Sequence, residues 1–401
     1  MTGPDVIPTR SAALEALAKF APRAGHLYAL QRNYDLGADQ HDNVSQLSPY
    51  IRHRLITEQE VLDAVLAHHS PQDAQKFIAE VFWRTYWKGW LEMRPDVWKQ
   101  YQSDLTQAWN NVQTQSGLRS RWQDACMGQT GIVCFDHWAR ELAQTGYLHN
   151  HARMWFASIW IFTLKLPWVL GADFFLRHLL DGDCASNTLS WRWVAGLQTR
   201  GKHYLAEPEN IARFTKGRFR PQAGDLDTDA QPLDGPMPPD PSAPPTAQDI
   251  DLTRPSALLL HMDDLAPDDL LDQGLRPMVT IMLPPSERMT PLRMSDKVQT
   301  FRSAALLDVT NRLADLLGDV VTCAPGQTLA AAKAAGAEQI VTHYAPTGPV
   351  ADNLAQIDGL PLHQALRPFD ARAWPYATKG FFKFKDKIPA LLAAMRDKAP
   401  A

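Results

Sequence analysis

The sequence predicts a multidomain protein in which an all-α helical domain is followed by an α/β domain with a mostly parallel sheet. Three observations lead to this prediction. The chain has 401 residues, enough for two domains that each bury a core of their own. The first half carries helical periodicity almost throughout. After a stretch rich in Pro and Asp, the pattern changes to short apolar runs that alternate with helical segments.

Residues 1–220 form the predicted helical domain. Apolar residues recur with helical spacing from Ser11 to about Phe214, and β-branched alternation is nearly absent. Most of the 13 tryptophans lie in this part, between Trp83 and Trp193. Such aromatic density is typical of a large helical core, although stacking platforms or an electron relay would also produce it.

Residues 221–254 are poor in apolar side chains, which predicts an extended linker, and residues 255–401 form the predicted α/β domain. Short apolar runs mark its expected strands: Ser256 to Met262, Met278 to Leu283, Asp319 to Cys323 and Gln339 to Tyr344. Helical stretches between them predict a parallel sheet with crossover helices. Neither a G-x-G-x-x-G motif nor a Walker A motif follows any strand, so the sequence does not predict a nucleotide site of the usual type there.

Charge and cysteine content limit the classes of function. Residues 1–220 hold 24 Lys and Arg against 21 Asp and Glu, a net charge of +3 within a chain of net charge −4. A protein that binds nucleic acid mainly through phosphates would be more basic, so we expect any DNA contact to be local and in the first half. The four cysteines show no CxxC spacing, which argues against a zinc site, an iron–sulfur cluster or a disulfide framework.

The sequence has neither a long apolar run nor a leader-like beginning, so we expect a cytoplasmic protein without membrane contact. No metal is expected, because Asp181 and Asp183 have no third ligand spaced near them. These two carboxylates precede a helix and could simply cap it.

Four motifs in the helical domain combine polar side chains with helix starts or helix faces. In NVSQLSPYIRHRLITEQEV, Ser45 and Ser48 stand where a diphosphate could bind, although a plain N-cap would look the same. In AEVFWRTYWKGW, Glu80 and Arg84 share a helical face with tryptophans, and a surface ion pair is the alternative. The other two motifs are GYLHNHARMW and LLDGDCASNTLSWRWVAG.

Together and in this order, the motifs resemble the FAD-binding domain of photolyases and cryptochromes, chiefly through LSPY, WR after a glutamate, HN-x-x-RM and DGD-x-x-x-N-x-x-x-W. The resemblance covers about half of the chain and implies one FAD. The positions that it implies for cofactor binding are Tyr28, Ser45, Gln46, Leu47, Ser48, Phe77, Glu80, Arg84, Asn150, Arg153, Asp181, Asp183 and Asn187.

The resemblance also implies roles for individual side chains. Asp181 would form a buried ion pair with Arg153 beside the flavin. Asn187 matches the position that faces flavin N5, where a carboxamide accepts a hydrogen bond from N5–H and favours reduced flavin. The residues expected to take part in the chemistry are Glu80, Asn187, Trp191 and Trp168, the last two as members of an electron relay whose outer member would be Trp122 or Trp109.

A further set matches the residues with which photolyases hold a cyclobutane pyrimidine dimer that is flipped out of DNA. This lesion-binding set is Glu80, Trp83, Asn150, Met154 and Trp193. Met154 stands where enzymes for the (6-4) lesion would have a histidine, so the set points to the cyclobutane dimer.

The sequence departs from the family pattern in two ways. Val44, Gln46 and Phe77 replace a usual Thr, Arg and Trp, which affects the expected FAD affinity or redox tuning. The domain order is also swapped, because photolyases carry an α/β antenna domain before the FAD domain. Residues 255–401 weakly resemble that antenna domain, and an unrelated doubly wound domain is the alternative.

The leading functional hypothesis is therefore a monomeric lyase that uses light and FAD to repair cyclobutane pyrimidine dimers in single- or double-stranded DNA. The first alternative is a cryptochrome-like blue-light receptor or redox flavoprotein without repair activity. The second is a non-photochemical flavoprotein that has kept the fold and lost the pocket. Asn187 and the lesion-binding set favour repair.

Overall fold

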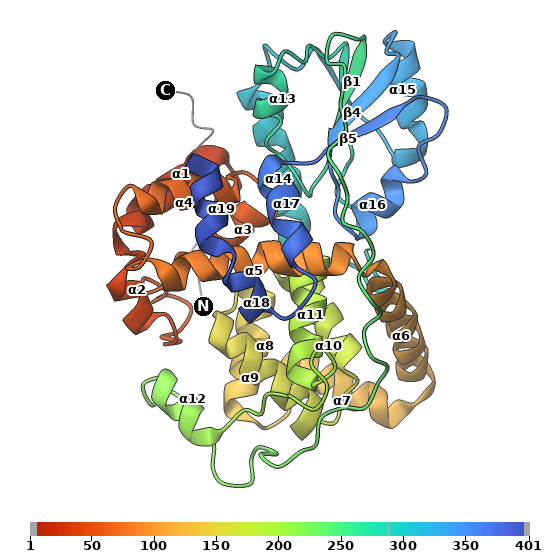
Figure 1. Cartoon of the computed structure of the whole chain (residues 1–401). Coiled ribbons are helices and arrows are strands. Elements are labelled where there is room, and N and C mark those ends of the chain that lie inside the picture. The colour runs from red at the N-terminus through yellow and green to blue at the C-terminus, as the bar shows by residue number, and fades with distance from the viewer. Residues whose placement is uncertain (1–5, 287–288, 397–401) are drawn as a thin grey trace.

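The computed structural model describes residues 6–286 and 289–396. The first half is helical, as predicted, and surrounds one long central helix, α5 (Figure 1). The longer helices of this half are α1 (Arg10–Phe20), α4 (Glu58–Leu66), α5 (Gln75–Glu92), α6 (Pro95–Thr114), α7 (Ser116–Met127), α8 (Val133–Thr145), α9 (Asn150–Ser158), α10 (Trp168–His178) and α11 (Cys184–Ala195). The shorter ones are α2 (His26–Gln31), α3 (Ser48–Arg52) and α12 (Pro208–Phe214), and a π-helical turn covers Ile159–Thr163.

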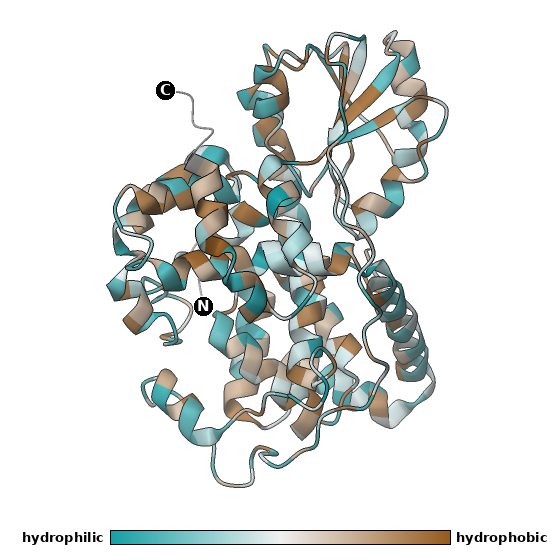
Figure 2. Ribbon diagram, viewed as in Figure 1, coloured by the Kyte–Doolittle hydropathy of each residue, from teal (hydrophilic) through white to brown (hydrophobic). Residues whose placement is uncertain are grey.

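Local chemistry accounts for several helix boundaries. Thr57 and Glu60 form a reciprocal capping box at the start of α4. The carboxylate of Asp183 accepts from the backbone N–H of Ser186 and caps α11. The peripheral helix α6 buries apolar side chains at helical spacing and is mostly hydrophilic on the face seen in Figure 2.

The second half contains a five-stranded sheet of order β3-β2-β1-β4-β5, and every strand pair is parallel. Its strands are β1 (Ser256–Leu260), β2 (Val279–Met282), β3 (Asp319–Thr322), β4 (Gln339–His343) and β5 (Leu362–Ala365). Its helices are α13 (Asp268–Asp272), α14 (Asp296–Arg312), α15 (Thr328–Ala334) and α16 (Pro349–Leu354). The four expected strands and the predicted parallel sheet are confirmed. The edge strand β5 was not predicted, because its half-buried LHQA has no apolar run.

After β5 the chain returns to the helical half, where α17 (Pro368–Ala373), α18 (Phe381–Lys385) and α19 (Ile388–Arg396) end the described residues. The helices α17 and α18 pack against α5, and α19 packs against α17 (Figure 1). The side chain of Phe82 on α5 contacts both Phe369 and Phe384, at ring-centroid distances of 5.5 and 6.1 Å. Trp374, which lies between α17 and α18, packs against α5 at Gly89. A Cβ at this position would lie 2.7 Å from Trp374 Cδ1, so the contact requires glycine. The last helices of the chain therefore belong to the surface of the helical half.

Residues 221–254 contain neither helix nor strand and run along the helical half (Figure 1). Backbone hydrogen bonds fix parts of this segment, from Leu233 N to Ala195 O at 2.9 Å and from Ser242 N to Met93 O at 2.8 Å. In the part of the chain that the structure describes, no helix combines the length and the apolar character needed to span a bilayer.

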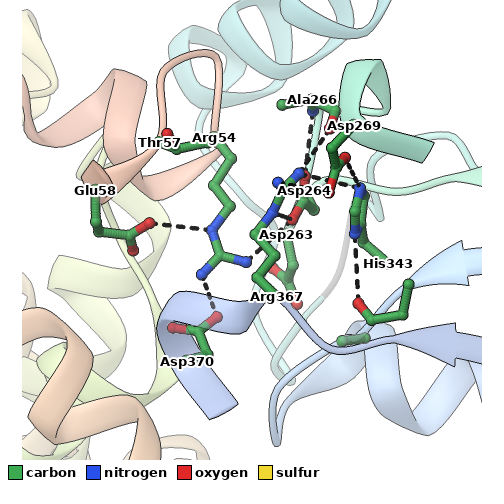
Figure 3. A network of polar contacts seen from close by, with 12 residues as sticks. Arg54, Thr57, Glu58, Asp263, Asp264, Ala266, Asp269, His343, Arg367 and Asp370 are labelled. Carbon is green, nitrogen blue, oxygen red and sulfur yellow. Dashed lines mark hydrogen bonds and ion pairs between the residues drawn. The ribbon is translucent and has the colours of Figure 1, made fainter. Parts of the chain in front are cut away.

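A buried network of charged side chains connects the two halves (Figure 3). The guanidinium of Arg54 binds Glu58 on its own side, Asp264 after β1 at 3.0 Å, and Asp370 on α17. Arg367 also binds Asp264, at 2.6 Å. If one partner of a buried ion pair is removed, the other charge stays buried without compensation, which strongly destabilises the fold. This network therefore fixes how the sheet sits against the helices that carry the site described next.

Candidate functional site

A cavity of about 450 Å³ opens in the helical half, between α5, α9, α11 and the loop that leads into α3. It brings together nearly all the residues expected from the sequence. Those that line it are Tyr28, Ser45, Gln46, Ser48, Phe77, Glu80, Trp83, Arg84, Asn150, Arg153, Met154, Asp181, Asp183, Asn187, Trp191 and Trp193. Leu47 and Trp168 are not among the lining residues. Leu47 is fully buried, and Trp168 packs against Tyr101 at a ring-centroid distance of 5.8 Å.

Helical spacing explains why α5 contributes so many of these side chains. Phe77, Glu80 and Arg84 lie three and four residues apart, so they share one face of the helix, and that face turns to the cavity. The start of α9 and the start of α11 face α5 across the same space. Three segments that are distant in sequence thus meet around one site.

Three ion pairs cross this site, and each joins different segments. Nη1 of Arg84 lies 2.8 Å from Oδ2 of Asp183, and Nη2 of Arg153 lies 3.0 Å from Oδ2 of Asp181. The second pair is the one that the resemblance led us to expect. The third pair joins Arg32 to Glu80, with 2.7 Å between Nη1 and Oε1. Glu80 and Arg84 therefore do not pair with each other on the surface, as the alternative interpretation of their motif would have it.

The charges around Asp181 keep it ionised. Burial acts to raise the pKa of this carboxyl, but the nearby guanidinium groups of Arg153 and Arg84 outweigh burial and hold the pKa below its usual value. Asp183 serves two purposes, since it caps α11 and also holds Arg84. Both expectations for these carboxylates, helix capping and a site role, are compatible with the geometry.

Asn187 has a defined orientation. Its Nδ2 donates a 2.7 Å hydrogen bond to the carbonyl of Ala172, which identifies the amide nitrogen through its partner. The side chain is buried and lines the cavity. Its Oδ1 is therefore the atom that can accept a hydrogen bond from a bound molecule.

The site offers donors for an anionic group and flat surfaces for an aromatic one. A guanidinium has five N–H donors. Arg84 uses one of them to bind the carboxylate of Asp183, so other donors remain for an anionic ligand. Ser45 and Ser48 add hydroxyls. Because α3 has only five residues, its helix dipole adds little, and the donors that the cavity offers to an anion are these side chains. Ser186 Oγ and Trp191 Nε1 are buried and have no hydrogen-bond partner among the described residues, and both residues line the cavity.

Trp191 is held at the cavity by close packing. A Cβ at residue 171 would lie 2.3 Å from Trp191 Cη2, so only glycine fits beneath the indole. The nearest tryptophan ring is Trp160, with centroids 6.2 Å apart and planes at 89°. Trp168, expected as the next relay member, has its ring contact with Tyr101 instead. Trp109 and Trp122, the candidates for the outer member, contact each other at 5.3 Å.

Sequence reasoning missed several residues of this site. Arg32 is the most important, because it lines the cavity and pairs with Glu80. Its sequence context, QRNYD, matches no motif, and only its contact across 48 residues of sequence identifies it. Tyr147 and Trp160 were missed for the same reason: in the sequence they look like ordinary core aromatics.

Comparisons with known proteins match the region of the chain that contains most of this site. The family model described as the FAD binding domain of DNA photolyase matches residues 77–218. The deoxyribodipyrimidine photo-lyase of Streptomyces griseus is 33% identical over 163 residues, which cover 39% of this chain and 33% of that protein. The enzyme of the same name from Synechococcus sp. is 31% identical over 205 residues, 47% of this chain and 39% of that protein.

The structure of a class III photolyase from Agrobacterium tumefaciens is 26% identical in sequence to this chain and superposes with a TM-score of 0.43. The match covers 52% of this chain and 43% of the photolyase. The chain thus spans between about a third and two fifths of the length of the curated relatives named above.

FAD is the cofactor of the matched region, and the cavity fits it. The donors of Arg84, Ser45 and Ser48 suit the diphosphate, and the aromatic walls suit the ring systems. The unpartnered Trp191 Nε1 and the free Oδ1 of Asn187 offer one donor and one acceptor to the polar edge of a flavin.

Proposed function

Because this chain belongs to the photolyase/cryptochrome family through its FAD-binding region, we propose that it is a light-driven lyase that repairs cyclobutane pyrimidine dimers in DNA. The observation that carries the proposal is that one cavity is lined by both groups of expected residues. The flavin group includes Arg84, Asp181 and Asn187, and the lesion group includes Trp83 and Met154.

FAD supplies the absorption of light and the electron that the repair of a dimer requires. The residues of this chain do the rest. Arg84 and the serines would hold the diphosphate, and the Oδ1 of Asn187 would accept a hydrogen bond from the flavin edge. Such an acceptor favours reduction of the flavin, because oxidised flavin carries no proton at N5 and the reduced form does.

The lesion-binding set would receive the dimer on the other side of the same cavity. One face of Trp83 is covered by Phe381, so Trp83 and Trp193 would offer flipped pyrimidines only the ring surface that each turns to the cavity. Met154 would adapt to their shape. Glu80 keeps its place through Arg32 and offers a carboxylate to the polar edge of a base. A damaged pair is easier to unstack than an intact one, which provides selectivity without a strongly basic surface.

We also propose that residues 1–220 are the FAD-binding domain, residues 221–254 the linker, and residues 255–401 an α/β domain of the antenna type placed after it, whose helices α17 and α18 pack back onto the first domain. The parallel order β3-β2-β1-β4-β5 supports the last assignment. Limited proteolysis tests it: cleavage within residues 221–254 should leave two fragments that stay associated through the Arg54 network.

The decisive experiment measures repair directly. Purified protein with reduced FAD is mixed with an oligonucleotide that carries one cyclobutane dimer, kept in the dark or illuminated with blue light, and assayed for loss of the dimer. We expect loss only in light. Photoreduction of the flavin without loss of dimers would reject the repair proposal and favour a photoreceptor. An oligonucleotide with a (6-4) lesion is the substrate control, and it should remain unrepaired.

A further inference from the structure

A short basic segment, residues 376–388, lies beside the cavity and has no role in the site described so far. It contains four lysines and one acidic residue, Asp386, within a chain of net charge −4. Three of the lysines, Lys379, Lys383 and Lys387, are exposed. Phe382 is 80% exposed, which is the largest exposed fraction of any large hydrophobic side chain in the described residues.

The position of this segment follows from one ring contact. Phe381, the first residue of α18, stacks on Trp83 with centroids 3.6 Å apart and planes at 12°. Trp83 lines the cavity, so the basic segment lies directly behind one of its walls. The hydroxyl of Tyr86 on α5 donates a 2.8 Å hydrogen bond to the carbonyl of Lys379 and fixes the start of the segment.

The alternation of buried and exposed side chains sets what the segment presents to solvent. Phe381 and Phe384 are buried against α5, while Phe382 and Lys383 between them point to solvent. None of the four lysines forms an ion pair with an acidic residue in the part of the chain that the structure describes. Their charge is therefore available to an external anion.

We propose that residues 376–388 bind the phosphate backbone of the DNA strand that flanks the dimer, with Phe382 stacking on a base next to it. This inference rests on the proposed repair function and adds a contact surface to it. Lysines bind phosphates as point charges without reading sequence, and an exposed aromatic ring stacks on any unpaired base. The combination of both beside a base-sized cavity fits a single strand that leaves the cavity.

The surroundings of the segment favour DNA over a membrane surface. A helix that lies on a bilayer presents a broad apolar face to it. Here the apolar side chains of α19, such as Leu391 and Met395, are buried against the helical half. The exposed rings of the segment are Phe382 and Tyr376, and Lys387 lies over the ring of Tyr376. Two separate rings among lysines, without a continuous apolar face, suit stacked bases better than a layer of acyl chains.

The test compares two double variants that lose the same charge. Lys383→Gln with Lys387→Gln removes two lysines of the segment. Lys297→Gln with Lys333→Gln removes two exposed lysines of α14 and α15 and is the control. All four residues are exposed, so both proteins should fold and keep FAD, which the melting temperature and flavin absorbance verify.

The readout is the affinity for a single-stranded oligonucleotide, with and without a dimer, as a function of salt. Each phosphate contact contributes about 0.7 to the slope of log K against log salt on single strands, so the segment variant should lose about 1.4 of slope and the control nothing. At ~0.1 M salt this corresponds to roughly a tenfold or larger loss of affinity. Phe382→Ala should weaken binding about fivefold or more at unchanged slope.

Two outcomes would overturn the inference: equal slopes for the segment variant and the wild type, or lysine-dependent binding to phosphatidylserine vesicles with an unchanged DNA slope. The repair assay on the wild type is scored separately. A loss of slope in a protein that does not repair dimers would reject the repair function and leave the DNA-binding surface in place.

Discussion

Arg52 and Asp263 join the cavity to the sheet, with 2.7 Å between Nη2 and Oδ1. Arg52 ends the short helix α3, which begins at Ser48 on the cavity wall. Its Nε also donates a 3.0 Å hydrogen bond to the carbonyl of Gly182, which lies between the two site carboxylates. Asp263 follows strand β1. The carboxyl end of a parallel strand is a common ligand site, and in this protein an arginine of the helical half occupies it.

The first prediction follows from this pair. Both side chains are buried, so Asp263→Ala leaves the charge of Arg52 without a partner and should lower the free energy of unfolding by about 3 kcal/mol. FAD should also be released faster, because Arg52, which lies on the same short helix as Ser48 and is hydrogen-bonded to Gly182, is no longer held by Asp263. Thermal denaturation and the rate of flavin release measure the two effects. Glu338→Gln breaks the exposed pair with Arg254 in the same half and is the matched control, with an expected loss below about 1 kcal/mol. Equal effects of the two changes would contradict the coupling.

The second prediction concerns retention of FAD. Arg84→Ala removes a charge-assisted donor from the diphosphate side of the cavity, which we expect to weaken FAD binding roughly tenfold to a hundredfold. The cap of α11 should persist, since Asp183 still accepts from Ser186 N. Equilibrium dialysis with the apoprotein gives the affinity. Lys76→Gln on the exposed start of the same helix is the control and should bind FAD like the wild type. Unchanged affinity in Arg84→Ala would show that the diphosphate lies elsewhere.

The third prediction concerns electron entry into illuminated oxidised flavin. Trp191→Phe keeps an apolar ring over Gly171 and removes the easily oxidised indole. We expect the rate of photoreduction to fall at least tenfold, which corresponds to an activation barrier higher by about 1.4 kcal/mol, while the FAD content stays unchanged. Absorbance under blue light with an external donor measures the rate. Trp160→Phe and Trp168→Phe then distinguish the neighbour found in the structure from the one expected by resemblance. Wild-type rates in Trp191→Phe would mean that the electron arrives by another route.

Local patterns made much of this architecture predictable. The strands β1 and β4 are short apolar runs with fully buried side chains, which is the pattern of a parallel sheet. The Arg153–Asp181 pair was expected because the motifs that contain these residues resemble those of photolyases and cryptochromes. What remained hidden depends on contacts between distant residues. Arg32 reaches Glu80, and Phe381 reaches Trp83 across almost 300 residues, without any periodic signal in the sequence.

The same limit explains why we expected DNA contacts only in the first half. The charge count along the sequence assigned the second half a net charge of −7, from 16 basic and 23 acidic residues. The fold returns residues 376–388 to the helical half, where Phe381 stacks on Trp83 of the cavity wall. Net charge per segment therefore describes a surface only after the fold has placed that segment.

The last prediction concerns acid, and it centres on His149. This side chain is 1% exposed and caps α9, where its Nδ1 accepts a 3.2 Å hydrogen bond from the backbone N–H of His151. Burial, together with the positive charges of His41 and His151 when protonated, lowers its pKa from 6.5 to about 3. Because the folded pKa lies below the unfolded one, its contribution to stability is complete above about pH 6.5 and declines as the pH falls toward about 3.

Since α9 carries Asn150, Arg153 and Met154, we expect acid to release FAD as well as to destabilise the fold. Each pH unit in that window should remove about 1.4 kcal/mol through this one group. His149→Asn supplies an oxygen that caps a helix and does not titrate, so its stability and FAD content should change less between pH 6.5 and pH 5 than those of the wild type. Chemical denaturation and flavin fluorescence across this range provide the comparison. Parallel pH profiles for the two proteins would show that other groups, such as His178 with its pKa lowered to about 4, govern the acid response.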